Sequence, residues 1–196
     1  MRVISGYLKG RKLLFPVDRK HLRPTKDITR EAIFDVLREW IMGKRVLDLF
    51  AGTGALGIEA VSHGASEVVF VESEAEGINL IRRNVETLDI SGNCSVKKGK
   101  VERVITEFEK ERFNLVIADP PYGYPENKME SILKNIVELQ VIDCDGIIVI
   151  EHGRRDVIPG VDGLRIYKEK FYGKSTVSYL RLKNHNEKDS GLSGQL

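Results

Sequence analysis

The stretch Val46-Leu47-Asp48-Leu49-Phe50-Ala51-Gly52-Thr53-Gly54-Ala55-Leu56-Gly57 decides the fold of this chain. Its apolar first half is typical of a buried strand, its glycines form a turn, and its last residues begin a helix. Glycines let the backbone approach a ligand closely and leave N–H groups at the start of the helix. The three glycines fit the pattern G-x-G-x-x-G of nucleotide-binding βαβ units. The stretch therefore predicts an α/β protein with a nucleoside site at the end of this strand.

Beyond this stretch, strands and helices alternate regularly along the chain. We expect strands at 45–50, 67–71, 94–97, 113–118 and 146–150, and helices at 55–63, 74–88, 101–108 and 129–139. Two further strands, at 164–171 and 176–182, flank Gly173-Lys174 and predict an antiparallel hairpin. Such alternation predicts a mostly parallel sheet with helices on both faces.

The first 42 residues predict a basic extension of this core. Short strands at 2–5 and 11–16 around a glycine-containing turn predict a hairpin, and a helix is expected over 26–41. Residues 1–30 hold nine Lys/Arg and two Asp, a net charge of +7, so the rest of the chain carries −5 to reach the total of +2. A basic arm on an acidic body favours contact with a polyanion.

The chain accordingly divides into three parts. Residues 1–42 are the basic hairpin and helix extension, 43–183 the catalytic domain, and 184–196 a polar tail that we expect to be disordered. The two cysteines, Cys94 and Cys144, fit no metal-binding spacing, so no metal is expected. No apolar stretch reaches the length of a membrane span, and the first residues do not resemble a signal peptide. These features predict a cytoplasmic protein with no membrane partner.

Two acidic residues distinguish between the ligands that a glycine loop can bind. Glu72 ends the strand after the loop, where a ribose-binding acid belongs. Asp48 lies just before the turn, where a carboxylate would repel a pyrophosphate but attract a cation. S-adenosylmethionine carries a ribose, an ammonium and a sulfonium group and no phosphate, so the pair favours this ligand. An NAD-dependent dehydrogenase, or a glycine turn needed only for close packing, remains open.

Asp119-Pro120-Pro121-Tyr122 is the second informative motif, and it follows the apolar strand 113–118. Two consecutive prolines cannot continue a sheet, because each lacks an N–H group and has a fixed φ. The chain must leave the sheet at the carboxyl end of a strand, which is where open α/β sheets bind ligands. A carboxylate, two rigid residues and an aromatic ring can hold a flat group that bears an amine there. A purely structural turn is the other interpretation.

Together, the loop and the proline motif resemble the amino-methyltransferases, whose glycine loop is followed by [D/N]-P-P-[Y/F]. The N-terminal segments narrow this resemblance to the bacterial enzymes that methylate N2 of a guanine in 16S ribosomal RNA, the small-subunit rRNA methyltransferase D family. These segments are Arg2-Val3-Ile4-Ser5-Gly6, Gly10-Arg11-Lys12-Leu13, Arg23-Pro24-Thr25 and Arg30-Glu31-Ala32-Ile33-Phe34. The resemblance covers residues 1–182. It implies a Rossmann-like class I methyltransferase with a seven-stranded, mostly parallel sheet ending in an antiparallel hairpin, plus an N-terminal β-hairpin and helix.

The resemblance also implies S-adenosyl-L-methionine as cofactor and S-adenosyl-L-homocysteine as product. The residues expected to hold the cofactor are Asp48, Phe50, Ala51, Gly52, Thr53, Gly54, Glu72, Ser73 and Asp119. One departure concerns the cofactor's adenine, because Lys100 stands about where many relatives carry an Asp that accepts from the adenine amine. Lysine can only donate, so backbone groups or Glu102 are expected to take that contact.

For catalysis, the Asp119 side chain and the Pro120 carbonyl are expected to accept the two amine hydrogens, while Tyr122 stacks on the base. The residues expected to bind RNA are Arg2, Lys9, Arg11, Lys12, Arg23, Thr25 and Arg30. The expected partner is 16S ribosomal RNA within the small ribosomal subunit or an assembly intermediate, bound by a monomer. Three alternatives stay open: methylation of adenine N6 in DNA or RNA, methylation of a protein glutamine, and a non-catalytic RNA-binding module.

Overall fold

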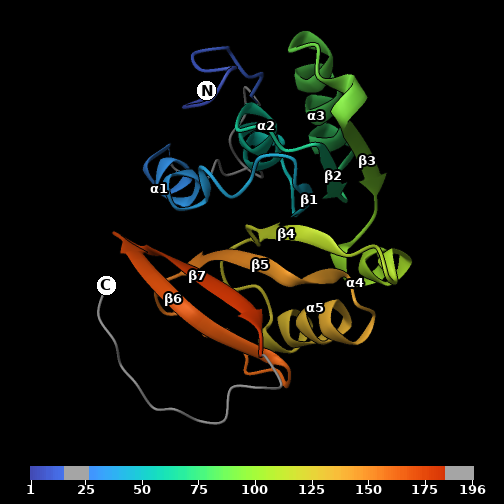
Figure 1. Cartoon of the computed structure of the whole chain (residues 1–196), viewed down its shortest axis with the longest axis vertical. Coiled ribbons are helices and arrows are strands. Elements are labelled where there is room, and N and C mark those ends of the chain that lie inside the picture. Colours follow the sequence, from blue (N-terminus) through green and yellow to red (C-terminus); the bar gives the residue numbers. More distant parts are fainter. Residues whose placement is uncertain (16–26, 184–196) are drawn as a thin grey trace.

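The computed structural model describes residues 1–15 and 27–183, and in these residues one seven-stranded sheet organises the chain (Figure 1). The strand order is β3-β2-β1-β4-β5-β7-β6. The strands are β1 (Arg45–Leu49), β2 (Glu67–Glu72), β3 (Cys94–Lys98), β4 (Phe113–Ala118), β5 (Ile142–Gly153), β6 (Leu164–Tyr172) and β7 (Ser175–Leu182). The first five run parallel, and β7 pairs antiparallel with both β5 and β6. The predicted sheet with its antiparallel hairpin is confirmed.

Helices cover both faces of this sheet. They are α1 (Asp27–Leu37), α2 (Ala55–Ser62), α3 (Ala75–Thr87), α4 (Val101–Val104) and α5 (Glu126–Glu138), with short 3-10 turns η1 (Ser91–Asn93) and η2 (Ile105–Phe108). In Figure 1, α1, α2 and α3 lie on one side of the sheet, and α4 and α5 lie on the other. Within the described residues, no helix combines the length and the apolar character that crossing a membrane requires.

Some helix and strand boundaries differ from those predicted. The first helix ends at Leu37 instead of residue 41, although Ile41 is still fully buried. A turn follows the helix there, in which the N–H groups of Trp40 and Ile41 both donate to the Leu37 carbonyl. Helix α5 begins at Glu126, three residues earlier than predicted, because Pro125 stands just before it with a φ suited to helix entry.

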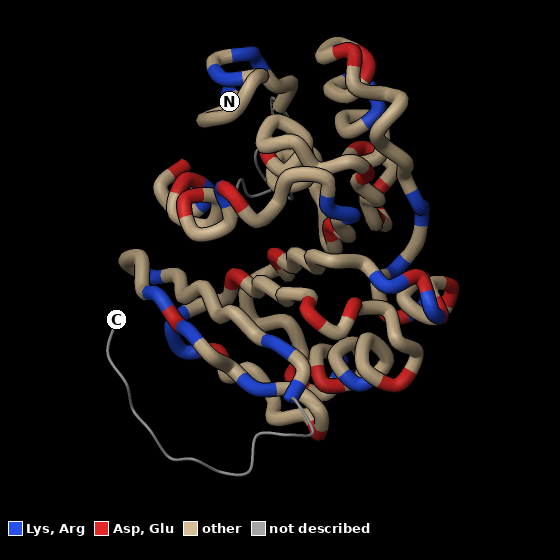
Figure 2. The backbone as a smooth tube through the Cα atoms, in the orientation of Figure 1, with Lys and Arg blue, Asp and Glu red and all other residues tan. Residues whose placement is uncertain are grey.

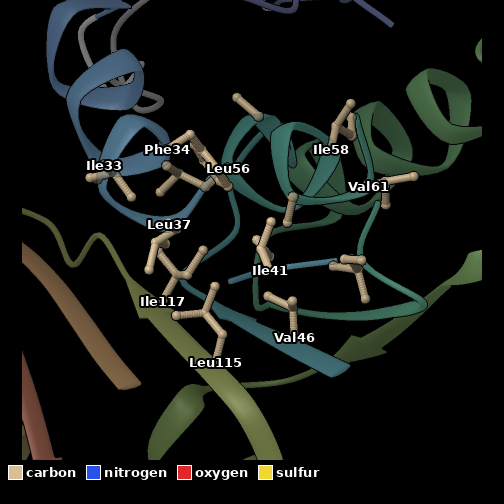
Figure 3. Packing of buried hydrophobic residues seen from close by; sticks show 14 of the residues in the cluster. Ile33, Phe34, Leu37, Ile41, Val46, Leu56, Ile58, Val61, Leu115 and Ile117 are labelled. Carbon is tan, nitrogen blue, oxygen red and sulfur yellow. The ribbon is translucent and has the colours of Figure 1, made fainter. Parts of the chain in front are cut away.

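The hydrophobic core on the α1–α2 side shows why the alternating pattern folds this way. Central strands such as β4 are apolar on both faces because helices cover both. On the α2 side of β1 and β4, the helices and strands contribute apolar side chains, most of them aliphatic (Figure 3). Those labelled are Ile33, Phe34, Leu37, Ile41, Val46, Leu56, Ile58, Val61, Leu115 and Ile117. A second cluster fills the α4–α5 side, so the sheet separates two apolar layers.

The N-terminal segment folds back on itself in residues 1–15, as expected, but its arms do not form regular strands. Arg2 and Lys12 make an isolated antiparallel bridge, and backbone hydrogen bonds join Val3 to Gly10 and Arg11, and Leu13 to Met1. The backbone N–H groups of Ile4 and Ser5 instead donate to the buried Glu59 carboxylate of α2, at 3.1 and 2.7 Å. A buried carboxylate needs several donors, and this one takes them from residues that were expected to form a strand. The segment therefore packs on α2, and its apolar residues Val3, Leu8 and Leu13 join the core.

Candidate functional site

A cavity of about 460 Å³ opens at the carboxyl ends of the parallel strands. The glycine loop after β1, the acidic end of β2, the start of α4 and the proline motif after β4 form its wall. Of the residues predicted to bind cofactor or act in catalysis, the wall includes Phe50, Ala51, Gly52, Thr53, Glu72, Ser73, Asp119, Pro120 and Tyr122. The structure thus brings both sequence motifs into one site, although Asp48 and Gly54 lie outside the wall.

Four neighbouring strands each place an acidic residue at or beside this cavity. The strand register pairs Leu49 with Ala118 and Ala118 with Ile150, so Asp119, just after β4, lies beside Glu151 near the end of β5. Glu72 is the last residue of β2, and Asp48 is the next-to-last residue of β1. Side chains alternate between the faces of a sheet. All four acids share the face that α2 covers. In each case the residue two positions earlier packs in the core on that side; these residues are Val46, Phe70, Ile117 and Val149.

Glu72 braces the glycine loop from inside the cavity. Its side chain is 7% exposed, and Oε2 accepts from the N–H of Gly52 at 2.6 Å. The other oxygen, Oε1, accepts from the N–H groups of Ser73 and Glu74 at 2.7 and 2.9 Å. Ser73 Oγ also lies 3.4 Å from Oε1, whereas Oε2 accepts only from Gly52, so Oε2 keeps the capacity for a ligand hydroxyl.

Asp48 lies beneath the loop, not in the cavity wall, which corrects the expectation that it faces the ligand directly. Its Oδ2 accepts from the Gly57 N–H at 2.8 Å and so caps the first turn of α2. Its Oδ1 is buried and has no hydrogen-bond partner in residues 1–15 and 27–183. Burial above all, and the nearby charges of Asp119 and Glu72, raise the pKa of Asp48 from 3.8 to about 8 against the opposing effect of the Gly57 bond. A cation bound next to these acids would stabilise the ionised form of Asp48 and lower its pKa.

The glycine loop is closed by internal contacts and offers no phosphate cradle. Its Gly52 N–H is used by Glu72, and the Gly54 N–H donates to the Ala51 carbonyl at 2.7 Å. Gly54 has a φ of +78°, and a Cβ on Gly57 would overlap the Phe70 ring, so both positions require glycine. A pyrophosphate needs free N–H groups and no adjacent carboxylates. The loop therefore argues against a dinucleotide and in favour of an uncharged or cationic nucleoside.

Aromatic rings line the mouth of the cavity around the proline motif. Tyr122 is 48% exposed, and its hydroxyl lies 3.1 Å from Ser175 Oγ at the start of β7. Tyr124 follows a turn closed by its N–H bond to the Pro121 carbonyl, and its ring meets Phe50 edge-on at 5.0 Å. Phe50 has a φ of +60°, an uncommon conformation for a residue with a side chain. A flat ring entering this mouth would find an exposed aromatic face beside the Asp119 carboxylate.

The opposite wall of the cavity carries the segment at which the sequence departs from the expected pattern. Lys100, Val101 and Glu102 all line it, and Lys128 Nζ lies 3.2 Å from a Glu102 oxygen. Burial would raise the pKa of Glu102, but hydrogen bonds and the Lys128 charge outweigh it and lower that pKa. Glu102 is therefore an ionised acceptor at this wall, next to the apolar, buried Val101.

The residues predicted to bind RNA separate into three groups. Arg2, Lys9, Arg11 and Lys12 are exposed on the N-terminal segment, where Figure 2 shows a cluster of basic residues. The prediction for Arg30 is wrong, because its side chain is fully buried, with Nε 3.4 Å from Glu59 and one terminal nitrogen donating to the Arg2 carbonyl at 2.8 Å. It anchors the N-terminal segment to α2. Arg23 and Thr25 lie outside the described residues.

Sequence reasoning missed Glu151, Tyr124 and Lys128 at this site. Glu151 could have been found, since it directly follows an apolar strand, as Glu72 ends one. The other two lie in or near α5 and follow no pattern that points to a site. Among the described residues, the acids and thiol that could hold a metal are Asp143, Cys144 and Asp145, in the amino-terminal part of β5 and away from the cavity wall.

Comparisons with known proteins agree with this geometry. The family described as "Conserved hypothetical protein 95" matches residues 1–181. A Bacillus subtilis protein named "Putative rRNA methyltransferase YlbH" is 38% identical over 181 residues, 91% of this chain and 97% of that protein. Ribosomal RNA small subunit methyltransferase D of Haemophilus influenzae is 30% identical over 94% of each chain. A solved structure titled "Putative methyltransferase yhhF from Escherichia coli" superposes with a TM-score of 0.80 at 27% identity, over 93% of this chain and 98% of that one.

Proposed function

The chain belongs to the Conserved hypothetical protein 95 family, that of ribosomal RNA small subunit methyltransferase D, and we propose that it methylates the N2 amine of one guanine in 16S ribosomal RNA. It is an S-adenosylmethionine-dependent methyltransferase acting on ribosomal RNA. The proposed acceptor lies in the small ribosomal subunit or an assembly intermediate. We further propose that the enzyme acts as a monomer in the cytoplasm.

The observation that carries this proposal is that one cavity joins the glycine loop to Asp119-Pro120-Pro121-Tyr122. S-adenosylmethionine supplies an electrophilic methyl group when it is bound. Glu72 Oε2 can also accept from a ribose hydroxyl, and a cationic ligand above Asp48 would be favoured because it would stabilise the ionised form of that buried carboxyl group. At the far wall, Val101 would pack on the adenine, and backbone groups or Glu102 would accept from its amine in place of the missing Asp.

The proline motif would orient the acceptor amine. Asp119 and the Pro120 carbonyl are two acceptors on a rigid turn, so each would accept one hydrogen of the exocyclic amine. The lone pair of the amine nitrogen would then face the methyl donor. When the N–C bond replaces the methyl C–S bond and S-adenosylhomocysteine leaves, the methylated nitrogen would be acidic, and Asp119 or water would take its proton. Tyr122 holds the flat base by stacking. Positioning is the main contribution, since Asp119 need not be a strong base. The base must lie in an exposed loop or leave its stack to reach the cavity.

Two basic surfaces would contact the RNA around that base. One is the N-terminal segment with exposed Arg2, Lys9, Arg11 and Lys12. The other is the edge strand β6, along which Figure 2 shows further basic residues. There the Arg181 guanidinium lies 4.8 Å from the Tyr167 ring and that of Arg154 lies 5.5 Å from Phe171. Alternating cations and exposed rings suit phosphates and unstacked bases.

The test is methyl transfer from labelled cofactor to RNA and to small ribosomal subunits. Asp119→Ala should lower kcat/KM by about 10²-fold or more while the protein stays folded, because an amine without its acceptor loses its orientation. Asp162→Ala is the matched control, since Asp162 is exposed and outside the cavity wall. Transfer at the wild-type rate by Asp119→Ala would sink the proposal. A non-catalytic RNA-binding module would instead bind no S-adenosylmethionine in calorimetric titration.

A further inference from the structure

We propose that Glu151 is the residue that selects guanine, by accepting the N1–H of the base while Asp119 accepts from the N2 amine. This inference rests on the proposed function and names the residue that sets its specificity. The proline motif alone accepts any exocyclic amine, so it does not distinguish guanine from adenine or cytosine. A second group at the site must make that distinction.

The fold places Glu151 beside Asp119. Strands β4 and β5 are parallel neighbours whose last paired residues are Ala118 and Ile150. Asp119 and Glu151 come next, one on each strand, and neighbouring strands lie about 4.8 Å apart. Both residues line the same cavity.

Because side chains alternate between the two faces of a sheet, the Asp119 and Glu151 carboxylates lie on the same face. Ile117 and Val149, two residues earlier on each strand, pack in the core on the α2 side of the sheet, whereas Ala118 and Ile150 pack on the opposite side. Glu151 pairs in register with Val177 of β7, which is in the α2-side core as well. Glu151 is 5% exposed, so its carboxylate is desolvated where a base would enter.

The chemistry of the bases makes such a pair of acceptors selective. On guanine, the N2 amine and N1–H are adjacent donors on one edge, which match two adjacent carboxylates. Adenine and cytosine each present an amine next to a ring nitrogen that carries a lone pair. Placing that lone pair against the carboxylate sets two acceptors against each other with no proton between them, and this repulsion is strong where water is excluded. Sites built to hydrogen-bond a substrate group reject analogues lacking it by about 10⁴-fold, so a preference of about 10²-fold or more is a conservative expectation for one such bond.

The other reading of Glu151 is that it only stabilises the end of β5. A structural role would lower methylation of every substrate equally, whereas a selective role changes the ratio between two substrates. 2-Aminopurine provides the comparison, because it keeps the N2 amine of guanine but has a lone pair at N1 in place of the N–H. Its different amine reactivity is the same for every variant and cancels when ratios are compared.

The experiment measures kcat/KM on an RNA or reconstituted subunit that carries guanine or 2-aminopurine at the modified position. Wild-type protein should prefer guanine by about 10²-fold or more. Glu151→Gln should reduce this preference at least about tenfold, since the amide can turn its NH₂ toward the N1 lone pair. Glu138→Gln, on an exposed residue of α5, should leave the preference unchanged. Affinity for S-adenosylhomocysteine should be the same in all three proteins.

The inference would be overturned if the preference in Glu151→Gln equalled that of the wild type. It would also be overturned, whatever the variants do, if wild-type protein methylated 2-aminopurine as fast as guanine. Should Glu151→Gln fail to fold, Glu151→Ala replaces it, because removing the carboxylate should also collapse the preference. If the protein methylates guanine N2 and Glu151→Gln has the same preference for guanine over 2-aminopurine as the wild type, only the role of Glu151 is refuted. Transfer to another base, or to none, refutes the proposed function together with it.

Discussion

Replacing Asp48 with asparagine should stabilise the cofactor-free protein, and the gain should increase with pH. Asp48 is 1% exposed, and its Oδ1 has no hydrogen-bond partner within the part of the chain that the structure describes. Burial, together with the charges of Asp119 and Glu72, raises its pKa from 3.8 to about 8. Asparagine keeps an oxygen that can accept from the Gly57 N–H and removes the buried charge.

Whether the stability of the wild type rises or falls with pH depends on which state, folded or unfolded, keeps the proton of Asp48. Below the unfolded pKa of 3.8, Asp48 is protonated in both states and contributes no pH dependence. Between 3.8 and about 8 the folded state keeps the proton and the unfolded state has lost it. The free energy of unfolding of the wild type therefore falls by about 1.4 kcal/mol per pH unit in this window. Across these roughly four pH units the wild type loses at most about 6 kcal/mol of unfolding free energy, and Asp48→Asn does not show this loss.

The assay is urea unfolding of both proteins at pH 5 and pH 8, without cofactor. All other groups titrate alike in the two proteins, so they cancel in the difference between them. The stability of Asp48→Asn relative to wild type should rise by about 2 to 4 kcal/mol from pH 5 to pH 8. The variant should also bind S-adenosylmethionine more weakly, because the charge that favours a cation is gone. A stability difference that is equal at both pH values, or smaller at pH 8, would refute the reasoning.

Two further predictions concern the framework of the site. Arg30→Ala should lower the free energy of unfolding by about 3 to 5 kcal/mol, because it leaves the fully buried Glu59 carboxylate without its cation. Urea unfolding measures this change. A loss below about 1 kcal/mol, which is typical of an exposed ion pair, would contradict the prediction. Gly57→Ala should cost about 1 to 3 kcal/mol, since the new methyl group would overlap the Phe70 ring. Phe70→Leu should recover part of that loss in the double variant, and purely additive losses would contradict the contact.

The sequence predicted the central sheet well because its signals are local. The strand at 113–118, for example, is a continuous apolar run, and the two prolines that follow Asp119 cannot continue a sheet. The site motifs were found for the same reason, since Asp119 and Glu72 stand at strand ends that the pattern marks. Parallel strands bring their ends together, so placing the two motifs in one cavity needed only the topology.

The failures arise where a residue's role depends on a partner distant in sequence. Arg30 looked like part of a basic run, but Glu59 on α2 draws it into the core. The same carboxylate takes the N–H groups of Ile4 and Ser5, so these two residues bond to α2 and not to the facing arm of the hairpin. Asp48 was rightly placed near the loop, yet only the structure shows that it faces Gly57 beneath the loop instead of the cavity. Charge patterns along a chain do not reveal such pairings.

The most direct test of the central claim is to identify the methylated atom. The protein would be incubated with labelled S-adenosylmethionine and with either 16S ribosomal RNA or small ribosomal subunits that lack the modification, and the labelled nucleoside would then be identified by mass spectrometry. We expect label in N2-methylguanosine at a single position, and labelling about 10²-fold slower or more when Asp119 is replaced by alanine. Label in N6-methyladenosine or in a ribosomal protein, or labelling by Asp119→Ala at the wild-type rate, would contradict the proposed function.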